Sequence, residues 1–473
     1  MVFSSETFLF LFLPAFLAIY YLTPNRWRSV TILLGSYVFY GWWRIDFLAL
    51  LFATTLWTYV FGLLVARTEG KQSKMLCIAG TVGCLSVLGF FKYFNFVAST
   101  VGSVLGQDPA ASTLWHVILP IGVSFYVFES ISYLVDVYRR ESLPARNFAD
   151  FASFVSLFPH LVAGPILRFR DLRDQFANRT HSLALFSQGM TIFIIGLAKK
   201  VLIADTVAPL ADTIFSQAAP TLIESWLGAG AYTIQLYFDF SGYSDMAIGL
   251  GLMMGFRLME NFNAPYTSKS ITEFWRRWHI SLSVWLRDYL YIPLGGNRKG
   301  VARTYFNLFI VMVLGGLWHG ANWTFVIWGT WHGAILAIER YFAWPKKSAT
   351  VPWSLLLTLL FIVLGWVMFR APNVGAAMTM YGGMVGLNGL GVTADVAWQL
   401  PREGLVVLAI AIGLTALEPR LKKLAEPELV IEGQGTAALR AQWLPAIAMS
   451  CLTVLVLMRL ADQAFSPFLY FQF

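Results

Sequence analysis

Charged residues are scarce in this chain of 473 residues. Only 13% of the residues are Asp, Glu, Lys or Arg, 57% are apolar, and the mean hydropathy is +0.63. Ordinary soluble domains are about 45–50% apolar and about 25% charged. The composition therefore excludes a disordered chain, a disulfide-stapled secreted domain and a typical cytosolic enzyme, and it predicts an all-α polytopic membrane protein.

Cysteine, early positive charge and nucleotide-binding motifs are also rare or missing. The three cysteines, Cys77, Cys84 and Cys451, lie in apolar runs without a disulfide or metal pattern, so we expect no metal site. No Lys or Arg precedes Arg26, which predicts a retained first span over residues 7–23 and not a cleaved signal peptide. The sequence has no G-x-x-x-x-G-K-[ST], G-x-G-x-x-G, G-x-S-x-G or H-E-x-x-H motif. These absences argue against ATP-driven transport, nucleophile-elbow hydrolysis and zinc proteolysis.

Long uncharged stretches are the candidate membrane spans. A spanning helix needs about 20 residues, so the chain has room for ten or more spans and for no separate soluble domain within 1–473. The longest stretch, 304–338, is long enough for two helical segments, broken near Gly315-Gly316 or at Asn322. The other long stretches are 47–66, 75–91, 182–198, 348–369 and 441–458.

Basic residues alternate between the loops and predict an orientation. Lys and Arg are enriched in cytoplasmic loops of membrane proteins. They follow the first, third and fifth apolar runs and are rare after the second and fourth, which places the N-terminus outside. The net charge of +8 then belongs to cytoplasmic loops and does not indicate nucleic-acid binding. The run 151–167, with basic residues on both sides, predicts a re-entrant or interfacial hairpin that lines a cavity.

Three polar clusters interrupt the apolar pattern, and ionisable groups at membrane depth usually mark a pathway or reaction site. The first, 237–245, contains Asp239, Ser241, Tyr243 and Asp245. We expect a polar break in a helix that lines a cavity. The alternative is a helix-capping turn with Ser241 or Asp245 as the cap.

The second cluster, 274–289, is rich in tryptophan and arginine. It predicts a half-buried interfacial helix, with Trp275 and Trp278 at headgroup level and arginines available for phosphate. The alternative, a simple anchor with snorkelling arginines, does not explain His279. Asp288 either fixes an arginine in place or forms a plain ion pair with Arg287 or Arg277. The candidate phosphate contacts are Arg276, Arg277 and Arg287.

The third cluster surrounds His319 in the middle of the longest uncharged stretch. A buried imidazole needs a partner or a cavity, and it exchanges protons near neutral pH, which suits a general base. Gly315, Gly316 and Gly320 would let a substrate or another backbone approach. A hydrogen-bonded structural histidine is the alternative, and His332 competes for the same role. His116 and His160 could each line the cavity, but no acid accompanies either of them in the sequence.

The combined tracts resemble the membrane-bound O-acyltransferase family, in its bacterial polysaccharide branch. The resemblance covers about residues 1–460 and is greatest to membrane proteins of alginate O-acetylation in pseudomonads. It rests on the tracts 158–165, 237–245, 261–266, 293–297 and 317–320, which include Asn261, Tyr266, Trp318 and His319.

The resemblance implies a fold, a reaction and partners. It implies a ring of about eleven transmembrane helices, with re-entrant helices, around a central tunnel in a bacterial inner membrane. His319 corresponds to the family's catalytic histidine and His279 to its second polar position. Acetyl-CoA is the expected cytosolic donor substrate, with no permanently bound cofactor, and periplasmic acetyl-transfer proteins and membrane lipids are the expected partners, with no nucleic acid. The expected tunnel-lining residues are Asp239, Ser241, Tyr243, Asp245, Asn261, Tyr266, Trp275, Trp278, Trp318, Asn322 and His332.

Other functions stay open at this stage. The same residues would serve an acyltransferase for cellulose or peptidoglycan, or a D-alanyl transferase for teichoic acid. A flippase or transporter also shows polar breaks in apolar helices, but this sequence has no inverted repeat. A structural scaffold of a polymer secretion complex is a further alternative.

Overall fold

Helices make up the secondary structure of the described chain. The computed structural model describes residues 1–106, 117–425, 437–462 and 469, and these ranges contain no strand. His116 lies outside them. The helices of eight residues or more are α1 (Leu13–Leu22), α2 (Arg28–Gly41), α3 (Ile45–Arg67), α4 (Gly70–Leu88), α5 (Phe94–Val104), α6 (Val123–Tyr138), α7 (Phe148–Ser156), α9 (Phe169–Ala177), α10 (Leu183–Ala198), α11 (Asp205–Phe215), α12 (Leu222–Met253), α15 (Val301–His319), α16 (Trp323–Tyr341), α18 (Ser354–Arg370), α19 (Val374–Met384), α21 (Arg402–Ala425) and α22 (Ala437–Asp462). The shorter ones are α8 (Phe158–Leu161), α13 (Ile271–Arg277), α14 (Ile280–Leu286), α17 (Trp344–Lys347) and α20 (Ala394–Ala397), and the helical turns are η1 (Thr7–Phe12), η2 (Asn25–Trp27), η3 (Gly89–Tyr93), η4 (Lys199–Ala204), η5 (Pro265–Thr267), η6 (Arg287–Tyr291) and η7 (Ser348–Thr350).

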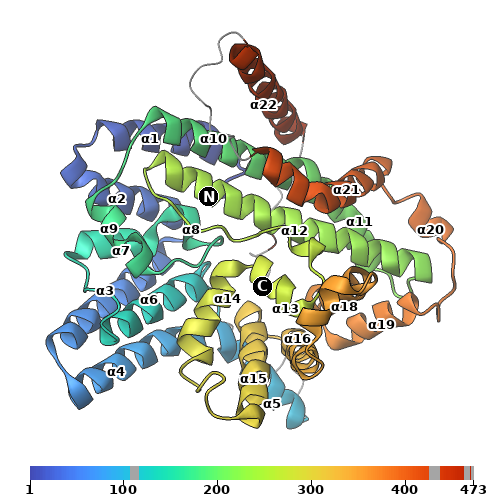
Figure 1. Cartoon of the computed structure of the whole chain (residues 1–473), viewed down its shortest axis with the longest axis horizontal. Coiled ribbons are helices and arrows are strands. Elements are labelled where there is room, and N and C mark those ends of the chain that lie inside the picture. Colours follow the sequence, from blue (N-terminus) through green and yellow to red (C-terminus); the bar gives the residue numbers. More distant parts are fainter. Residues whose placement is uncertain (107–116, 426–436, 463–468, 470–473) are drawn as a thin grey trace.

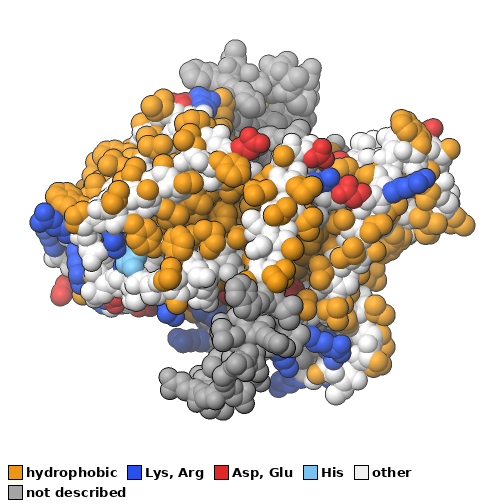
Figure 2. Space-filling model, turned by 90° about the horizontal axis from the view of Figure 1, so that it is seen from above, with side chains coloured by type: hydrophobic (Ala, Val, Ile, Leu, Met, Phe, Trp, Pro, Cys, Tyr) orange, Lys and Arg blue, Asp and Glu red, His pale blue; other side chains and the backbone are white. Residues whose placement is uncertain are grey.

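Apolar helices identify the molecule as a membrane protein. Among the described residues, four helical stretches are long and apolar enough to cross a bilayer: Ile45–Arg67, Gly70–Val104, Val301–His319 and Arg402–Lys423. Thr7–Leu22 and Ser354–Arg370 are shorter apolar helices. Hydrophobic side chains cover most of the surface in Figure 2, and charged ones lie in small groups. The all-helical membrane fold is thus confirmed, whereas about eleven spans and a tunnel stay predictions.

Glycine contacts hold the long central helix α12 against α10. A Cβ on Gly242 would lie 2.7 Å from the Gly196 carbonyl oxygen, and one on Gly249 would lie 2.5 Å from that of Gly189. Glycine at these four positions lets the two backbones touch, which is how helices pack tightly where lipid removes the hydrophobic driving force. The pair forms one wall of the molecule beside the short central helices (Figure 1).

The short helices α13 and α14 lie near the middle of the view, with longer helices around them (Figure 1). Glu339 of α16 fixes the start of α13. Its carboxylate accepts hydrogen bonds from the backbone N–H groups of Ile271 at 2.6 Å and Thr272 at 2.8 Å. A carboxylate satisfies the free N–H groups of a helix N-terminus and complements its dipole.

The run 151–167 does not cross the membrane as one helix. It lies in α7, of nine residues, and α8, of four, and both are buried in protein. Neither is long enough to span a bilayer, and the re-entrant or interfacial hairpin that lines a cavity stays a prediction. Likewise, the stretch 304–338 forms two helices, α15 and α16. The break falls at 320–322, where Asn322 caps α16, and Gly315-Gly316 lies inside α15.

Candidate active site

His319 is the last residue of α15. Its exposed fraction is only 5%. Gly316 and Gly329 bring α15 and α16 into backbone contact, because a Cβ on either would collide with a carbonyl oxygen of the other helix. The glycines around His319 therefore admit another backbone, which was one of the two expected uses. Asn322, expected to line a tunnel, caps α16 by accepting from the Thr324 N–H at 3.1 Å and donates to the Pro372 carbonyl at 3.0 Å.

His279 stands between α13 and α14 in a left-handed backbone conformation. Its φ is +44° and its side chain is fully buried. Outside glycine, such a φ is uncommon and often occurs at functional sites. The predicted continuous helix over 274–289 is therefore wrong, because the chain turns at Trp278-His279 and forms two short helices, followed by the turn η6. This turn moves the histidine ring into the protein interior, away from the arginines.

Asn261 organises the surroundings of His279. Its side-chain oxygen lies 3.3 Å from His279 Nδ1 and accepts hydrogen bonds from Ser281 Oγ at 2.9 Å and Ser281 N at 3.2 Å. Its amide group donates to Ser244 Oγ of α12 at 3.2 Å. A buried network of this kind fixes the orientation of an imidazole. Asn261 was expected to line the tunnel; the structure places it against His279, and its tunnel-lining role stays a prediction.

The two histidines face each other in a dry aromatic enclosure. Their ring centroids are 6.2 Å apart. The His319 ring also lies 5.0 Å from the ring of Trp318, 5.3 Å from Trp328 and 5.4 Å from Phe369. The structure therefore brings together two residues that are 40 positions apart in the sequence, on the ends of different helices. The space between two imidazoles excludes bulk water, which strengthens electrostatic interactions there.

His332 belongs to an adjoining aromatic layer. It is fully buried, and its Nδ1 accepts a hydrogen bond from Trp275 Nε1 at 3.3 Å. Tyr266 and Trp278 continue this layer, their rings 5.9 Å apart, and the Tyr266 hydroxyl donates to the Thr233 carbonyl at 2.9 Å. Trp278 is buried and Trp275 is half-buried, and the predicted position of both at headgroup level stays a prediction.

The polar segment 237–245 lies inside the continuous helix α12. The predicted break and the alternative capping turn are both wrong, since α12 continues from Leu222 to Met253. Ion pairs with η4 keep it intact: Asp239 pairs with Lys200 at 2.8 Å and Asp245 with Lys199 at 2.7 Å. The sequence shows both lysines, but not that they reach α12.

Ser241 and Tyr243 also lie within α12, and both are buried. The Tyr243 ring stacks on Phe3, with 4.6 Å between centroids. Tyr243 thus takes part in aromatic packing. The expected tunnel-lining roles of Tyr243, Ser241 and Asp239 stay predictions.

The arginines of the second cluster lie apart from the histidines. Arg276 and Arg287 are exposed. Arg277 pairs with Glu273 at 2.9 Å, and Arg287 pairs with Asp288 at 2.7 Å. Of the two ion pairs considered for Asp288, the one with Arg287 is confirmed.

Asp288 also gathers two arginines that sequence analysis did not connect to it. Arg168 Nη1 lies 2.9 Å and Arg170 Nη2 3.4 Å from its carboxylate. Burial by itself raises the pKa of Asp288, but the hydrogen bond from Arg287 and the charges of all three arginines lower it below the ordinary value. This site is thus a fixed arginine cluster around an ionised carboxylate.

Two buried ionisable groups, Glu129 and Lys92, were missed by the sequence analysis. His160 Nδ1 lies 2.8 Å from Glu129 Oε1, both side chains being fully buried, so the statement that no acid accompanies His160 is wrong. Lys92 donates to the carbonyl oxygen of His319 at 3.1 Å. The sequence already singles out Lys92, because it is the one charged residue in 75–104. Glu129 carries the same signal in 117–135.

Two buried imidazoles in a closed aromatic site can move a proton without a metal ligand set or a nucleotide motif, and this chemistry suits acyl transfer. A comparison with protein families agrees. Residues 81–382 match the model of the membrane-bound O-acyltransferase family, and the chain belongs to that family.

Named relatives cover the whole chain. It is 51% identical to the probable alginate O-acetylase AlgI of Pseudomonas putida and 50% identical to that of Azotobacter vinelandii, over 100% of both chains in each case. It is 39% identical to the peptidoglycan O-acetyltransferase of Helicobacter pylori, over 82% of this chain and 81% of the relative. The protein is a membrane-bound O-acyltransferase, and the resemblance found in its sequence is confirmed.

Proposed function

We propose that this protein transfers an acetyl group from cytosolic acetyl-CoA, through the membrane, toward the O-acetylation of an exopolysaccharide of the alginate type. The observation that carries the proposal is the buried pair His279 and His319, whose rings meet edge-on with 6.2 Å between centroids, at the start of α14 and the end of α15. The names of the full-length relatives support acetyl as the group and alginate as the final acceptor.

In this proposal His319 is the general base. Its imidazole takes the proton of the acceptor hydroxyl, the hydroxyl oxygen forms a bond to the thioester carbon, and the C–S bond breaks. The imidazolium returns its proton to the leaving thiolate. The Nδ1–H of His279 donates to the Asn261 side-chain oxygen, which fixes the ring so that it orients the donor. When the imidazole is doubly protonated, its Nε2–H donates a hydrogen bond to the oxyanion of the intermediate.

The donor is proposed to approach from the side of the basic loops, which we assign to the cytoplasm. Arg276 and Arg287 are exposed there and remain our candidates for the CoA phosphates, together with Arg277. The remaining expectations are proposals too: an inner-membrane location, an external N-terminus, a central tunnel and periplasmic acetyl-transfer proteins as receivers. A peptidoglycan acceptor is the second candidate, because one relative bears that name at 39% identity.

The test is the O-acetyl content of the secreted polysaccharide in a deletion strain carrying the wild-type gene, His319→Ala or His332→Ala, at matched membrane levels. We expect His319→Ala to abolish acetylation while polymer yield persists. His181→Ala is the matched control, since His181 lies in a loop against Arg28 and Tyr20. Unchanged acetylation in His319→Ala would overturn the catalytic assignment, and a loss confined to His332→Ala would transfer it to that residue.

A further inference from the structure

Lys92 is a buried lysine that holds the end of helix α15. Its Nζ donates to the carbonyl oxygens of Trp318 and His319, the latter at 3.1 Å, and to Ser124 Oγ at 3.3 Å. The hydroxyl of the next residue, Tyr93, donates to the Leu317 carbonyl at 2.8 Å. The last three carbonyls of α15 are thus all bound by two consecutive residues.

The local helix geometry explains how neighbours in sequence bind neighbouring carbonyls. Lys92 and Tyr93 end a π-helical turn, Gly89–Tyr93, within the stretch Gly70–Val104. Such turns are rare and are frequent at functional sites. The last carbonyls of a helix lack partners within it and carry the negative end of its dipole, so a cation is favoured there.

Lys92 has no carboxylate partner among the described residues. Two other buried lysines, Lys199 and Lys200, each pair with a carboxylate of α12 within 2.8 Å. No carboxylate of the described chain lies within 4.0 Å of Lys92 Nζ, so its hydrogen bonds go to carbonyl and hydroxyl oxygens alone. A buried ionisable group without a partner of opposite charge is costly, and such a group in a membrane protein marks a site of function.

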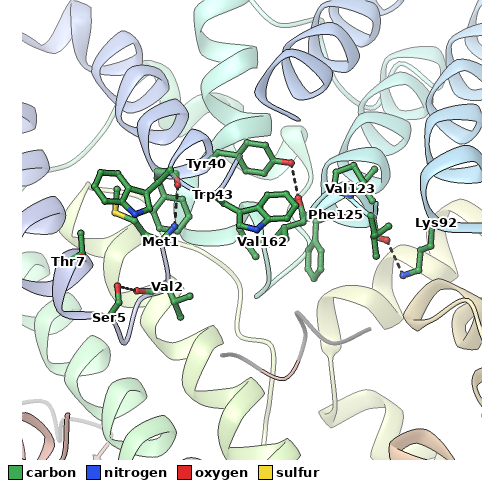
Figure 3. A pocket seen from close by; sticks show the side chains of 17 residues that line it. Met1, Val2, Ser5, Thr7, Tyr40, Trp43, Lys92, Val123, Phe125 and Val162 are labelled. Atoms are coloured by element: carbon green, nitrogen blue, oxygen red, sulfur yellow. Dashed lines mark hydrogen bonds between the residues drawn. The ribbon is translucent and has the colours of Figure 1, made fainter. Parts of the chain in front are cut away.

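A pocket of about 620 Å³ reaches Lys92 and Ser124. In Figure 3, Lys92 lies at one end of it and Thr7 at the other, with Met1, Tyr40 and Trp43 between them. The pocket is lined by the chain start and by segments 39–43 and 119–125. These segments lie at the helix ends opposite the basic loops after α1, α3 and α6. Among the residues that the structure describes, the lining includes Lys92 and no Asp or Glu.

We propose that Lys92 is a positioning residue for acyl transfer: from the floor of this pocket it fixes His319 at the point where the acyl acceptor arrives from the face opposite the basic loops. The inference rests on the proposed function. Lys92 acts through the backbone of His319, so its loss should lower kcat and leave the KM for acetyl-CoA unchanged.

The experiment replaces and then restores the ammonium group. Lys92→Cys is made in a chain whose three native cysteines are changed to Ala, and the purified protein in vesicles is alkylated with 2-bromoethylamine, which creates a lysine-like ammonium. The assay measures acetyl-CoA turnover with the receiver present. We expect kcat to fall about tenfold or more, as for a lost charged hydrogen bond, and to recover on alkylation. Lys74→Cys, exposed on the same helix, is the matched control and should stay at the level of the cysteine-free parent.

Each outcome either supports or overturns the inference about Lys92. A kcat for Lys92→Cys within twofold of the parent, or a low kcat that complete alkylation leaves low, overturns the inference. If Lys92→Cys does not accumulate, Tyr93→Phe tests the same clamp by removing one hydroxyl, and a wild-type kcat there also overturns it. If the parent itself turns over no acetyl-CoA, the proposed donor is wrong, which is a separate result.

Discussion

At the scale of single residues, the left-handed backbone conformation of His279 limits which side chains can replace it. A φ of +44° is tolerated by Asn much better than by a β-branched residue. We expect His279→Asn to fold like wild type, whereas His279→Val lowers the free energy of unfolding by about 1–3 kcal/mol. Thermal unfolding in detergent measures the difference. Equal midpoints for the two variants would show that the left-handed turn does not constrain this position.

A second residue-scale prediction concerns Asp288 and acid. The pKa of this carboxyl in the folded protein is below its ordinary value, so Asp288 stabilises the fold at neutral pH. That contribution begins to fall below about pH 4, near the unfolded value, and is lost as the pH passes the lower folded pKa. We expect Asp288→Asn to be less stable than wild type at pH 7 and the gap between their melting temperatures to close on acidification. A gap that is constant down to pH 3 would contradict this.

The histidines and the surrounding polar residues were largely predictable from the sequence, but their partners were not. His319 is unusual in a long uncharged stretch and His279 in its tryptophan- and arginine-rich cluster, whereas Asn261 was singled out by the family resemblance. The hydrogen bond between Asn261 and Ser281, and the clamp of Lys92 on α15, join segments that lie 20 and more than 200 residues apart. No helical periodicity encodes such contacts, because they depend on how the helices cross.

At the scale of elements, α12 shows why polar residues misled the prediction. Asp239 and Asp245 suggest a broken helix, but lysines of η4 compensate both charges, and the helix continues. Gly242 is a similar case, because a glycine also suggests a weak helix. Here its missing side chain makes room for α10, and α12 continues. A residue that breaks a helix in water can serve helix packing in a membrane.

The packing of α12 against α10 can be tested by comparing two glycines of α12. We expect Gly242→Ala to destabilise the protein by about 1–3 kcal/mol through overpacking against α10. A Cβ at Gly230 of α12 meets no heavy atom within 4 Å, so Gly230→Ala should be neutral or stabilising by up to about 1 kcal/mol. Melting temperatures in one detergent compare the two. A Gly242→Ala variant as stable as Gly230→Ala would mean that α10 and α12 separate easily.

At the scale of the whole molecule, the proposed orientation rests on the alternation of basic loops. With the N-terminus outside, Trp42 lies between α2 and α3 on the outer face and Lys71 lies at the start of α4 on the cytoplasmic face. Both side chains are exposed. In a cysteine-free chain in intact spheroplasts, we expect a membrane-impermeant maleimide to label Trp42→Cys and to label Lys71→Cys only after lysis. The reverse pattern would invert the molecule, place the pocket at Lys92 on the cytoplasmic side, and make that pocket a donor site. Labelling of both variants in intact spheroplasts would indicate leaky membranes, which release of a cytosolic marker protein detects. The expected pattern would leave acetyl-CoA and the acceptor on opposite faces, with His319 as the group that both must reach.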